Sequence, residues 1–225
     1  MTDELLRYEI GEGVEAFSTR RDCVLPYPVI QAHQTHSVNV AVIDRPDYTR
    51  EELEGVDAMI TNLRGVAIGA RSADCIPVLL YDPVRQAVAA VHSGWRGTIN
   101  KISNWAIRAM ALNYGTRPED LVAVIGPGIG ADAFQVGEDV AQLFKQSGYP
   151  VEKIWSFRGP RTEGSMDGGH HIDLPEVVRI TLQTSGLRDE NIHMSGICTY
   201  RDTEFYSARR EGKECGRIIS SIKLI

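Results

Sequence analysis

Five short apolar segments, rich in β-branched residues, place the strongest constraint on the fold of this 225-residue chain. Each is bounded by Gly, Pro or Asp, a pattern typical of buried strands. They are VNVAVID (38–44), GVAIGAR (65–71), IPVLLYD (76–82), AVAAVH (87–92) and LVAVIGP (121–127). The last run of the tail TEFYSARREGKECGRIISSIKLI predicts a closing strand. The sequence therefore predicts a sheet structure in which several strands are buried.

Three other segments have the residue spacing or end signals of helices. They are 99–114, 137–148 and 173–187, and each ends at or near a glycine: Gly115, Gly148 and Gly186. Glycine is the residue that most easily adopts the left-handed conformation after a helix. Acidic residues open the second segment, and Pro175 lies near the start of the third, where its missing N–H is harmless. Strands and helices thus alternate, which indicates an α/β protein.

The segment SFRGPRTEGSMDGGHH (156–171) is polar and rich in glycine. Its length is typical either of a flap over a site or of a disordered loop, and we expect disorder. No fixed-period repeat or low-complexity stretch divides the chain, so we expect one domain spanning residues 1–225.

The charge and apolar pattern of the chain exclude several functional classes. A net charge of −6 disfavours binding to nucleic acid or anionic membranes. No apolar run is long enough to span a membrane and no signal peptide is recognisable, so we expect a cytoplasmic protein. Four cysteines without CxxC spacing do not indicate a disulfide scaffold.

Three residues that can bind a transition metal lie beside apolar strand-like runs: His36, Cys75 and His92. Imidazole and thiolate are ligands that zinc prefers, and three protein ligands with one open position are typical of catalytic zinc. The intervals of 39 and 17 residues match no compact metal motif. A strand-end histidine and a cysteine in an apolar run also have ordinary structural roles, and His33 competes with His36.

The same residues permit a metal-free interpretation, in which Cys75 is a thiolate nucleophile and a histidine is its base. The glycine-rich pieces HSGWRGT and IGPGIG allow close approach of an anion, with Arg96 as a charged donor. Neither piece matches a P-loop or a dinucleotide fingerprint, and both are equally consistent with tight turns. Arg96 is also a candidate partner for Asp74.

Taken together, several blocks in order along the chain resemble the bacterial YfiH or laccase-domain family, also called the multicopper polyphenol oxidase or purine nucleoside phosphorylase family. The blocks are FSTRR, HQTHS, DAMIT, RSADCIPVLLYD, AAVHSGWRGT, IGPGIGADAFQVGEDV, IDLPEVV, CTY and FYSARREGKECGRIIS. The resemblance implies a single α/β domain of the α+β type, a layered α/β/β/α sandwich with mixed sheets, related to a bacterial toxin deamidase. It also implies a metal site made by His36, Cys75 and His92, and the QTHS block ranks His36 above His33.

Two activities are attached to that family. A laccase binds about four copper ions with about ten histidines and a cysteine thiolate. The six histidines of this chain are too few for that set. The resemblance otherwise implies phosphorolysis of purine nucleosides (adenosine, inosine, guanosine, methylthioadenosine) and deamination of adenosine, which need one zinc ion. We therefore expect Zn²⁺, with Cu²⁺ and polyphenol oxidation as the alternative. A metal-free cysteine hydrolase and a binding protein without turnover also stay open.

On this hypothesis His36, Cys75 and His92 hold the zinc ion, and Asp74 moves a proton beside it. Arg71 and Arg96 are the candidates for holding phosphate, and Ser18 and Arg20 for reaching the nucleoside. The expected partners are a purine nucleoside and phosphate, with neither nucleic acid nor membrane. Family members usually have a longer glycine-rich stretch after STR, where this chain has only RDCVLPYPVIQA, so part of the nucleoside pocket is shortened.

Overall fold

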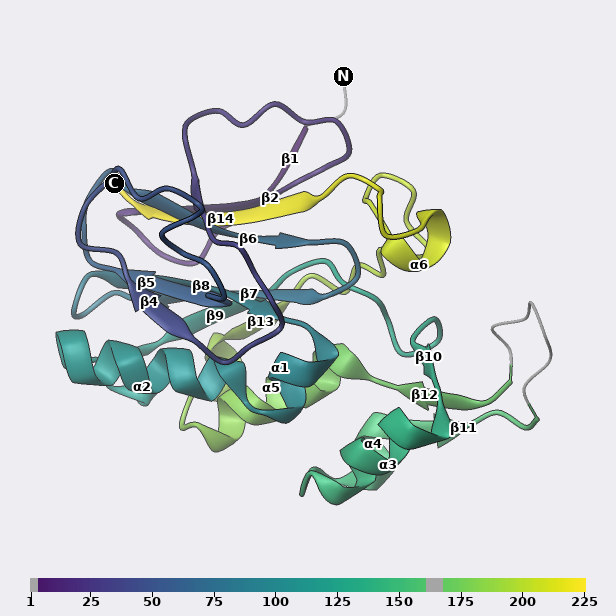
Figure 1. Ribbon diagram of the computed structural model, residues 1–225. Helices are drawn as coiled ribbons and strands as arrows, with labels where there is room; N and C mark the ends of the chain where they lie inside the picture. The colour runs from purple at the N-terminus through teal and green to yellow at the C-terminus, as the bar shows by residue number, and fades with distance from the viewer. Residues whose placement is uncertain (1–3, 161–167) are drawn as a thin grey trace.

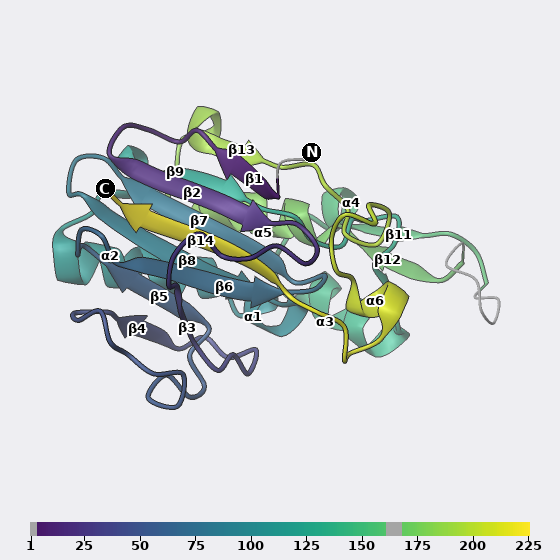
Figure 2. The same cartoon turned by 90° about the horizontal axis from the view of Figure 1, so that it is seen from above.

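The computed structural model describes residues 4–160 and 168–225. Their two larger β-sheets are mixed and stacked face to face, with a layer of helices below one of them, and a third sheet of three strands lies to one side (Figure 1). The expected α/β class with mixed sheets is confirmed. The view from above shows the strands of the two sheets running in similar directions (Figure 2). One hydrophobic core lies between the sheets, and a larger one lies between the six-stranded sheet and the helices.

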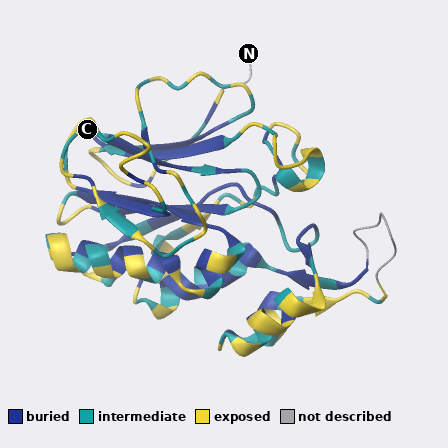
Figure 3. Cartoon of the chain, viewed as in Figure 1, coloured by how far each residue is buried: buried dark blue, intermediate teal, exposed yellow. Residues whose placement is uncertain are grey.

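The six-stranded sheet is the central layer. Its order is β13 (Ile192–Met194), β9 (Val122–Ile125), β7 (Ile76–Asp82), β8 (Ala87–Ser93), β5 (Ala58–Thr61) and β4 (Val40–Val42). Every residue of β7 and β8 is buried, as the dark blue strands of Figure 3 show. Both faces of these strands are covered, one by the other sheet and one by helices, so their sequences are continuously apolar rather than alternating.

The five-stranded sheet has the order β1 (Leu5–Tyr8), β2 (Val14–Thr19), β14 (Ile218–Leu224), β6 (Ala67–Ser72) and β3 (Ile30–Gln31). The predicted closing strand is β14, which enters between β2 and β6 and runs antiparallel to both. Its register places Ile218 opposite Ser72. The chain just before β14 therefore lies at the end of β6, immediately before Cys75.

The predicted helix over 99–114 is two helices, α1 (Trp95–Ile99) and α2 (Ile102–Tyr114). They are separated at Lys101, which has a left-handed φ of 60° and cannot continue a right-handed helix. The glycines mark the ends of helices as predicted: Gly115 follows α2 with φ 71°, and Gly186 follows α5 (Leu174–Thr184) with φ 105°. Both helices pack under the six-stranded sheet (Figure 1).

A small lobe extends from one end of the sandwich (Figure 1). It contains β10 (Gln135–Val136), β12 (His170–Ile172), β11 (Trp155–Phe157), α3 (Glu138–Gln146) and α4 (Val151–Ile154). The stretch 156–171, expected to be a loop, thus contributes the ends of two strands, and 161–167 lie outside the described residues. The remaining elements are α6 (Ala208–Glu211) and two 3₁₀ turns, Pro118–Asp120 and Asp189–Asn191. Within residues 4–160 and 168–225, no helix has the length and apolar character needed to cross a membrane.

Candidate metal and anion site

The three expected metal ligands come together at one end of β7 and β8. The Sγ atom of Cys75 lies 3.7 Å from Nε2 of His36, and the ring centroids of His36 and His92 are 5.0 Å apart. One potential ligand atom from each residue lies within 4.8 Å of the others. Cys75 directly precedes β7, and His92 lies opposite Pro77 in the neighbouring antiparallel strand β8. Antiparallel pairing therefore brings together two residues that are 17 positions apart in the sequence.

Gly94 provides the space for this cluster. A Cβ atom at position 94 would lie 2.4 Å from Cδ2 of His36 and 3.2 Å from Sγ of Cys75. The first separation is far below van der Waals contact, so any larger residue would displace His36 or the backbone. The glycine in HSGW is thus required by the close approach of the His36 ring.

Asp57 organises both histidines, although sequence reasoning assigned it no role. Its buried carboxylate accepts a hydrogen bond from Nδ1 of His92 at 2.8 Å. It also accepts the backbone N–H groups of Thr35, His36 and Ser37 at 3.1, 3.0 and 2.7 Å, and the Ser37 hydroxyl at 2.7 Å. These bonds hold His36 in a left-handed conformation, with φ 62°. In the sequence, Asp57 stands out only as the first residue of the DAMIT block. Its distance along the chain from His36 and His92 gives no sign that it contacts either histidine.

The pKa values of these groups are strongly shifted. Burial alone would raise the pKa of the Cys75 thiol, but the His92 and His36 rings outweigh burial and lower it. Burial would also lower the pKa of His92, which its interactions with Cys75 and Asp57 raise instead. Asp57 is likewise buried, yet hydrogen bonds from His92 and Ser37 hold its pKa well below the usual range. Cys75 is therefore favoured as a thiolate, the form that binds metals and acts as a nucleophile.

The donor set fits a zinc ion. Ideal tetrahedral zinc with ordinary bond lengths separates a sulfur and a nitrogen ligand by about 3.5 Å. The separation of Cys75 Sγ and His36 Nε2 is 3.7 Å. Because Nδ1 of His92 donates to Asp57, its Nε2 atom is free to bind a metal, which is the usual arrangement for a ligating histidine. The same contacts also give a Cys75, His92, Asp57 array, so the metal-free interpretation uses the same atoms.

The cluster opens into a cavity of about 640 Å³. His36, Cys75 and His92 line it together with Arg50, Arg71, Lys213 and Arg217, which come from three distant parts of the chain. Burial, together with the positive charges of Arg50 and Arg217, lowers the pKa of Arg71. Among the described residues, no ion pair joins any of these three arginines to a carboxylate. Converging guanidinium groups without carboxylate partners favour a bound anion.

A buried hydroxyl adds a further polar group to this cavity. Ser72 lines the cavity and is 2% exposed, and its Oγ atom has no hydrogen-bond partner in the part of the chain that the structure describes. An unpaired buried hydroxyl is costly unless a ligand or water completes it. Of the two arginines predicted to hold phosphate, Arg71 lines the cavity. Arg50 and Arg217 line it as well, although the sequence analysis singled out neither of them. Arg50 lies outside the family blocks, and Arg217 lies within the block FYSARREGKECGRIIS, whose pattern does not place it at the cavity.

Asp74, the expected proton carrier, is held by two hydrogen bonds. One carboxylate oxygen accepts the Thr199 hydroxyl at 2.7 Å, and the other accepts the backbone N–H of Arg209 at 2.6 Å. Its backbone is left-handed, with φ 87°. Asp74 therefore links the start of β7 to Thr199 and to α6, and its role in proton transfer stays a prediction.

The other predicted substrate residues lie outside the lining of this cavity. Ser18 is buried in β2, where its hydroxyl lies 2.7 Å from that of Ser220. The Arg20 guanidinium lies 5.3 Å from the centroid of the Phe205 ring. Arg96 is exposed and lies over the Trp95 ring at 4.2 Å, and no salt bridge joins it to Asp74. Their contacts with a nucleoside or phosphate stay predictions.

The remaining histidines are not gathered at the cluster. His33 pairs with Glu54 at the rim of the cavity, and His170 pairs with Glu138 in the small lobe. His171 is buried beside the Ala131 carbonyl, 3.1 Å from Nδ1, and His193 lies in β13. All six histidines fall within the described residues, and only two of them contribute to the metal-binding cluster.

The two-sheet sandwich with a Cys and two His at one end is that of a YfiH-like α/β protein. The structure superposes on the crystal structure of a Bacillus licheniformis hypothetical protein YfiH with a TM-score of 0.82 and 25% identity, covering 94% of this chain and 93% of that one. The family model described as multi-copper polyphenol oxidoreductase laccase matches residues 15–225. The chain belongs to this laccase-domain family, and the resemblance seen in the sequence is confirmed.

Two curated relatives carry names that describe purine nucleoside chemistry. A protein of Bacteroides thetaiotaomicron named purine nucleoside phosphorylase is 38% identical over 94% of this chain and 82% of its own length. A protein of an unknown prokaryotic organism named adenosine deaminase RL5 is 37% identical over 86% of this chain and 74% of its own length. These relatives support an enzyme that processes purine nucleosides.

Proposed function

We propose that the chain is a zinc-dependent purine nucleoside phosphorylase that also deaminates adenosine. The observation that carries the proposal is the single cavity in which the Cys75, His36, His92 cluster faces Arg50, Arg71 and Arg217. An anion site beside a metal site offers a place for phosphate next to a Lewis acid that would polarise a nucleoside bound there. The names of the relatives support the same chemistry.

In phosphorolysis a phosphate oxygen forms a bond to C1′ of the ribose, and the bond between C1′ and N9 of the purine breaks. The electron pair of that bond leaves with the purine, which takes up a proton, so the products are ribose 1-phosphate and the free base. Arg50, Arg71 and Arg217 bind phosphate and orient it toward C1′, and the Ser72 hydroxyl donates to the same anion. Proximity and charge neutralisation are the contributions of these side chains.

Deamination of adenosine uses water instead of phosphate and releases ammonia and inosine. A zinc ion bound by His36, Cys75 and His92 would supply Lewis-acid chemistry and a lowered pKa for bound water. Asp57 keeps the Nδ1–H of His92 fixed, so that Nε2 points to the cluster. Asp74 is the nearby carboxylate that we assign to proton transfer. The two activities therefore differ in whether they need the arginines.

Elemental analysis and turnover assays test the proposal together. Wild-type protein should contain about one zinc per chain, the number a three-ligand site holds. It should release base from inosine only when phosphate is present. Cys75→Ala should lose zinc and both activities, whereas the matched control Cys23→Ala, a partly buried cysteine outside the cluster, should keep them.

The same measurements distinguish the alternatives. Several copper ions per chain with phenol oxidation would instead support the polyphenol oxidase. A metal-free protein with full turnover that depends on Cys75 would support the cysteine hydrolase, for which the Cys75, His92, Asp57 array is the structural argument. Full nucleoside turnover in a zinc-free Cys75→Ala protein would refute the proposed function.

A further inference from the structure

One wall of the cavity is the short segment 213–217 between α6 and β14, which we call the C-terminal wall. All five of its residues line the cavity; Lys213 and Arg217 are basic and Glu214 is acidic, so the wall has a net positive charge. The Arg217 guanidinium donates to backbone carbonyls of its own segment, at 2.7 Å to Lys213 and 3.0 Å to Gly216. Its positive charge is therefore positioned by the path of the wall itself, since no carboxylate pairs with it among the described residues.

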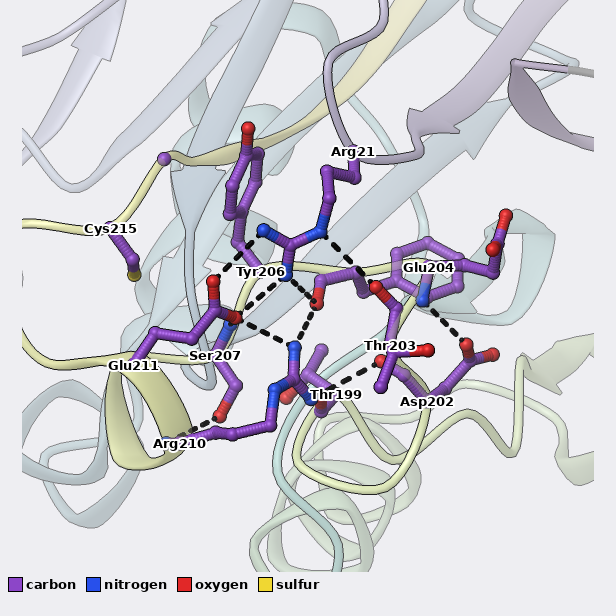
Figure 4. Close-up of polar contacts among 12 residues, drawn as sticks. Arg21, Thr199, Asp202, Thr203, Glu204, Tyr206, Ser207, Arg210, Glu211 and Cys215 are labelled. Atoms are coloured by element: carbon purple, nitrogen blue, oxygen red, sulfur yellow. Dashed lines mark hydrogen bonds and ion pairs between the residues drawn. The ribbon is translucent and has the colours of Figure 1, made fainter.

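The C-terminal wall is anchored at its start by an ion pair between two distant segments. Both carboxylate oxygens of Glu211, the last residue of α6, accept from the Arg21 guanidinium, at 2.8 and 2.9 Å (Figure 4). Arg21 follows β2 and also donates from Nε to the Thr203 carbonyl at 3.2 Å. A bidentate pair of this kind fixes orientation as well as distance. We call the pair of Arg21 and Glu211 the latch.

Tyr206 connects the latch to the C-terminal wall. The Arg21 guanidinium lies 4.3 Å from the centroid of the Tyr206 ring. Gly216 packs against the same ring so closely that a Cβ atom there would lie 2.3 Å from Cζ. Figure 4 shows Arg21, Tyr206 and Glu211 side by side, with Cys215 of the wall beside them. Arg21 therefore contacts both Glu211, which Arg210 and the Ser207 amide also hold, and the ring against which the wall packs, whose hydroxyl donates to Asp22.

The metal cluster has a separate anchor. Asp57 accepts hydrogen bonds from the backbone amide of His36 and from Nδ1 of His92, while Cys75 directly precedes β7 and His92 lies on the paired strand β8. None of these hydrogen bonds involves α6, the latch or the C-terminal wall. Different hydrogen bonds thus hold the two halves of the cavity, and the halves meet at Asp74, the neighbour of Cys75, which accepts the Arg209 amide of α6 at 2.6 Å.

We propose that Arg21 and Glu211 are positioning residues for the anion half of the cavity, because the latch holds the C-terminal wall and with it Arg217. The ligand that depends on the latch is a phosphate-sized dianion, and the identification of that dianion as a substrate rests on the proposed function. Loss of the latch weakens phosphate binding and leaves the Cys75, His36, His92 cluster intact.

The sign of the effect separates positioning from simple electrostatics. Glu211→Gln removes a negative charge near the cavity, so long-range electrostatics alone predicts tighter binding of phosphate. Positioning predicts weaker binding, because an amide cannot pair with both nitrogens of the Arg21 guanidinium. We expect the dissociation constant to rise about tenfold, the order for loss of one charge-assisted hydrogen bond to an anion.

The test uses the full-length, zinc-loaded protein, with binding of inorganic phosphate measured by calorimetry. Glu176→Gln is the matched control, because Glu176 forms a similar bidentate pair with Arg179 on α5, at 2.7 Å for both bonds, away from the cavity. Glu211→Gln should bind phosphate more weakly, keep its zinc and keep its kcat for adenosine deamination. Arg21→Lys should show a smaller loss. Hydrogen exchange of the amides in 213–217 should accelerate in both latch variants and stay unchanged in the control.

Unchanged or tighter phosphate binding in Glu211→Gln, with unchanged exchange in 213–217, would overturn the latch. An equal loss of binding in Glu176→Gln, or loss of zinc in Glu211→Gln, would do the same by showing a general effect on the fold. Failure of the proposed function has a different signature: wild-type protein that binds phosphate in a latch-dependent way yet releases no purine base.

Discussion

Replacement of Asp57 by Asn is the sharpest test of how the metal cluster is built. In the wild-type protein one carboxylate oxygen accepts from the His36 amide and from His92 Nδ1, and the other accepts from the amides of Thr35 and Ser37 and from the Ser37 hydroxyl. Asparagine has the same shape but only one accepting oxygen. Whichever way its amide turns, at least two N–H donors that point at this buried position face an NH₂ group.

Each buried donor left without an acceptor costs about 1–3 kcal/mol, so Asp57→Asn should lower the free energy of unfolding by about 2–6 kcal/mol. Zinc affinity should fall about 10–100-fold, as expected when the carboxylate behind a ligating histidine is removed. Urea unfolding in the presence of a chelator measures the first effect without a contribution from bound metal. Titration of zinc against a competing chelator measures the second.

Asp82→Asn is the matched control for that experiment. Asp82 is also fully buried, but one of its oxygens accepts the Val84 and Arg85 amides, both at 2.9 Å, while the other has no partner among the described residues. An asparagine at position 82 keeps both bonds by turning its NH₂ group to the side where the wild-type protein already has an unpaired buried oxygen, so one unpaired buried group replaces another. Its stability should change by less than about 1 kcal/mol, and its zinc affinity should not change. Equal stability and zinc affinity in Asp57→Asn and wild type would refute the reasoning.

Three further predictions follow from other parts of the site. Gly94→Ala should lose zinc, because its Cβ would lie 2.4 Å from Cδ2 of His36. Gly137→Ala, where the nearest atom belongs to the movable Asp139 carboxylate, should keep its zinc, and elemental analysis of both purified variants measures the difference. Arg71→Met should raise the KM for phosphate about 10–100-fold, because it removes a charge-assisted contact, and should leave adenosine deamination intact. An equal loss of phosphorolysis and deamination activity in the variant would contradict this prediction. The Arg21 guanidinium lowers the pKa of Glu211 from 4.5 to about 2. The stability that the ion pair contributes is therefore complete above pH 4.5 and is lost as the pH falls toward 2. Acid unfolding of Glu211→Gln should therefore lack this component, and an unchanged acid profile would show that the pair contributes nothing.

Local patterns in the sequence determined most of the secondary structure. The run 76–82 is β7 without any change of bounds, because a strand covered on both faces is apolar throughout and Asp82 ends it. Gly115 and Gly186 fixed the ends of two helices through their left-handed backbone. The break at Lys101 was not visible, since a lysine at that position carries no signal for a positive φ.

The sequence also determined the chemistry of the ligands. His36, Cys75 and His92 were recognisable by residue type and by their family blocks, although their spacing is uninformative. Their approach to within 4.8 Å depends on the pairing of β7 with β8 and on the space left by Gly94. Ser18, expected at the substrate, lies in β2 with its hydroxyl against Ser220 of β14, a strand from the other end of the chain, and its contact with a substrate stays a prediction.

The surroundings of the ligands were decided by the tertiary structure alone. Asp57, Arg50 and Arg217 belong to no motif that relates them to the cysteine or the histidines. Asp57 reaches the site because β5 lies beside β8, and Arg217 because β14 enters the five-stranded sheet next to β6, with Ile218 opposite Ser72. Hydrogen bonds and charge interactions depend on distances of a few ångströms, and these distances are set by strand register across more than a hundred residues. Residue types thus specify what the site can bind, and strand pairing specifies which charges face it.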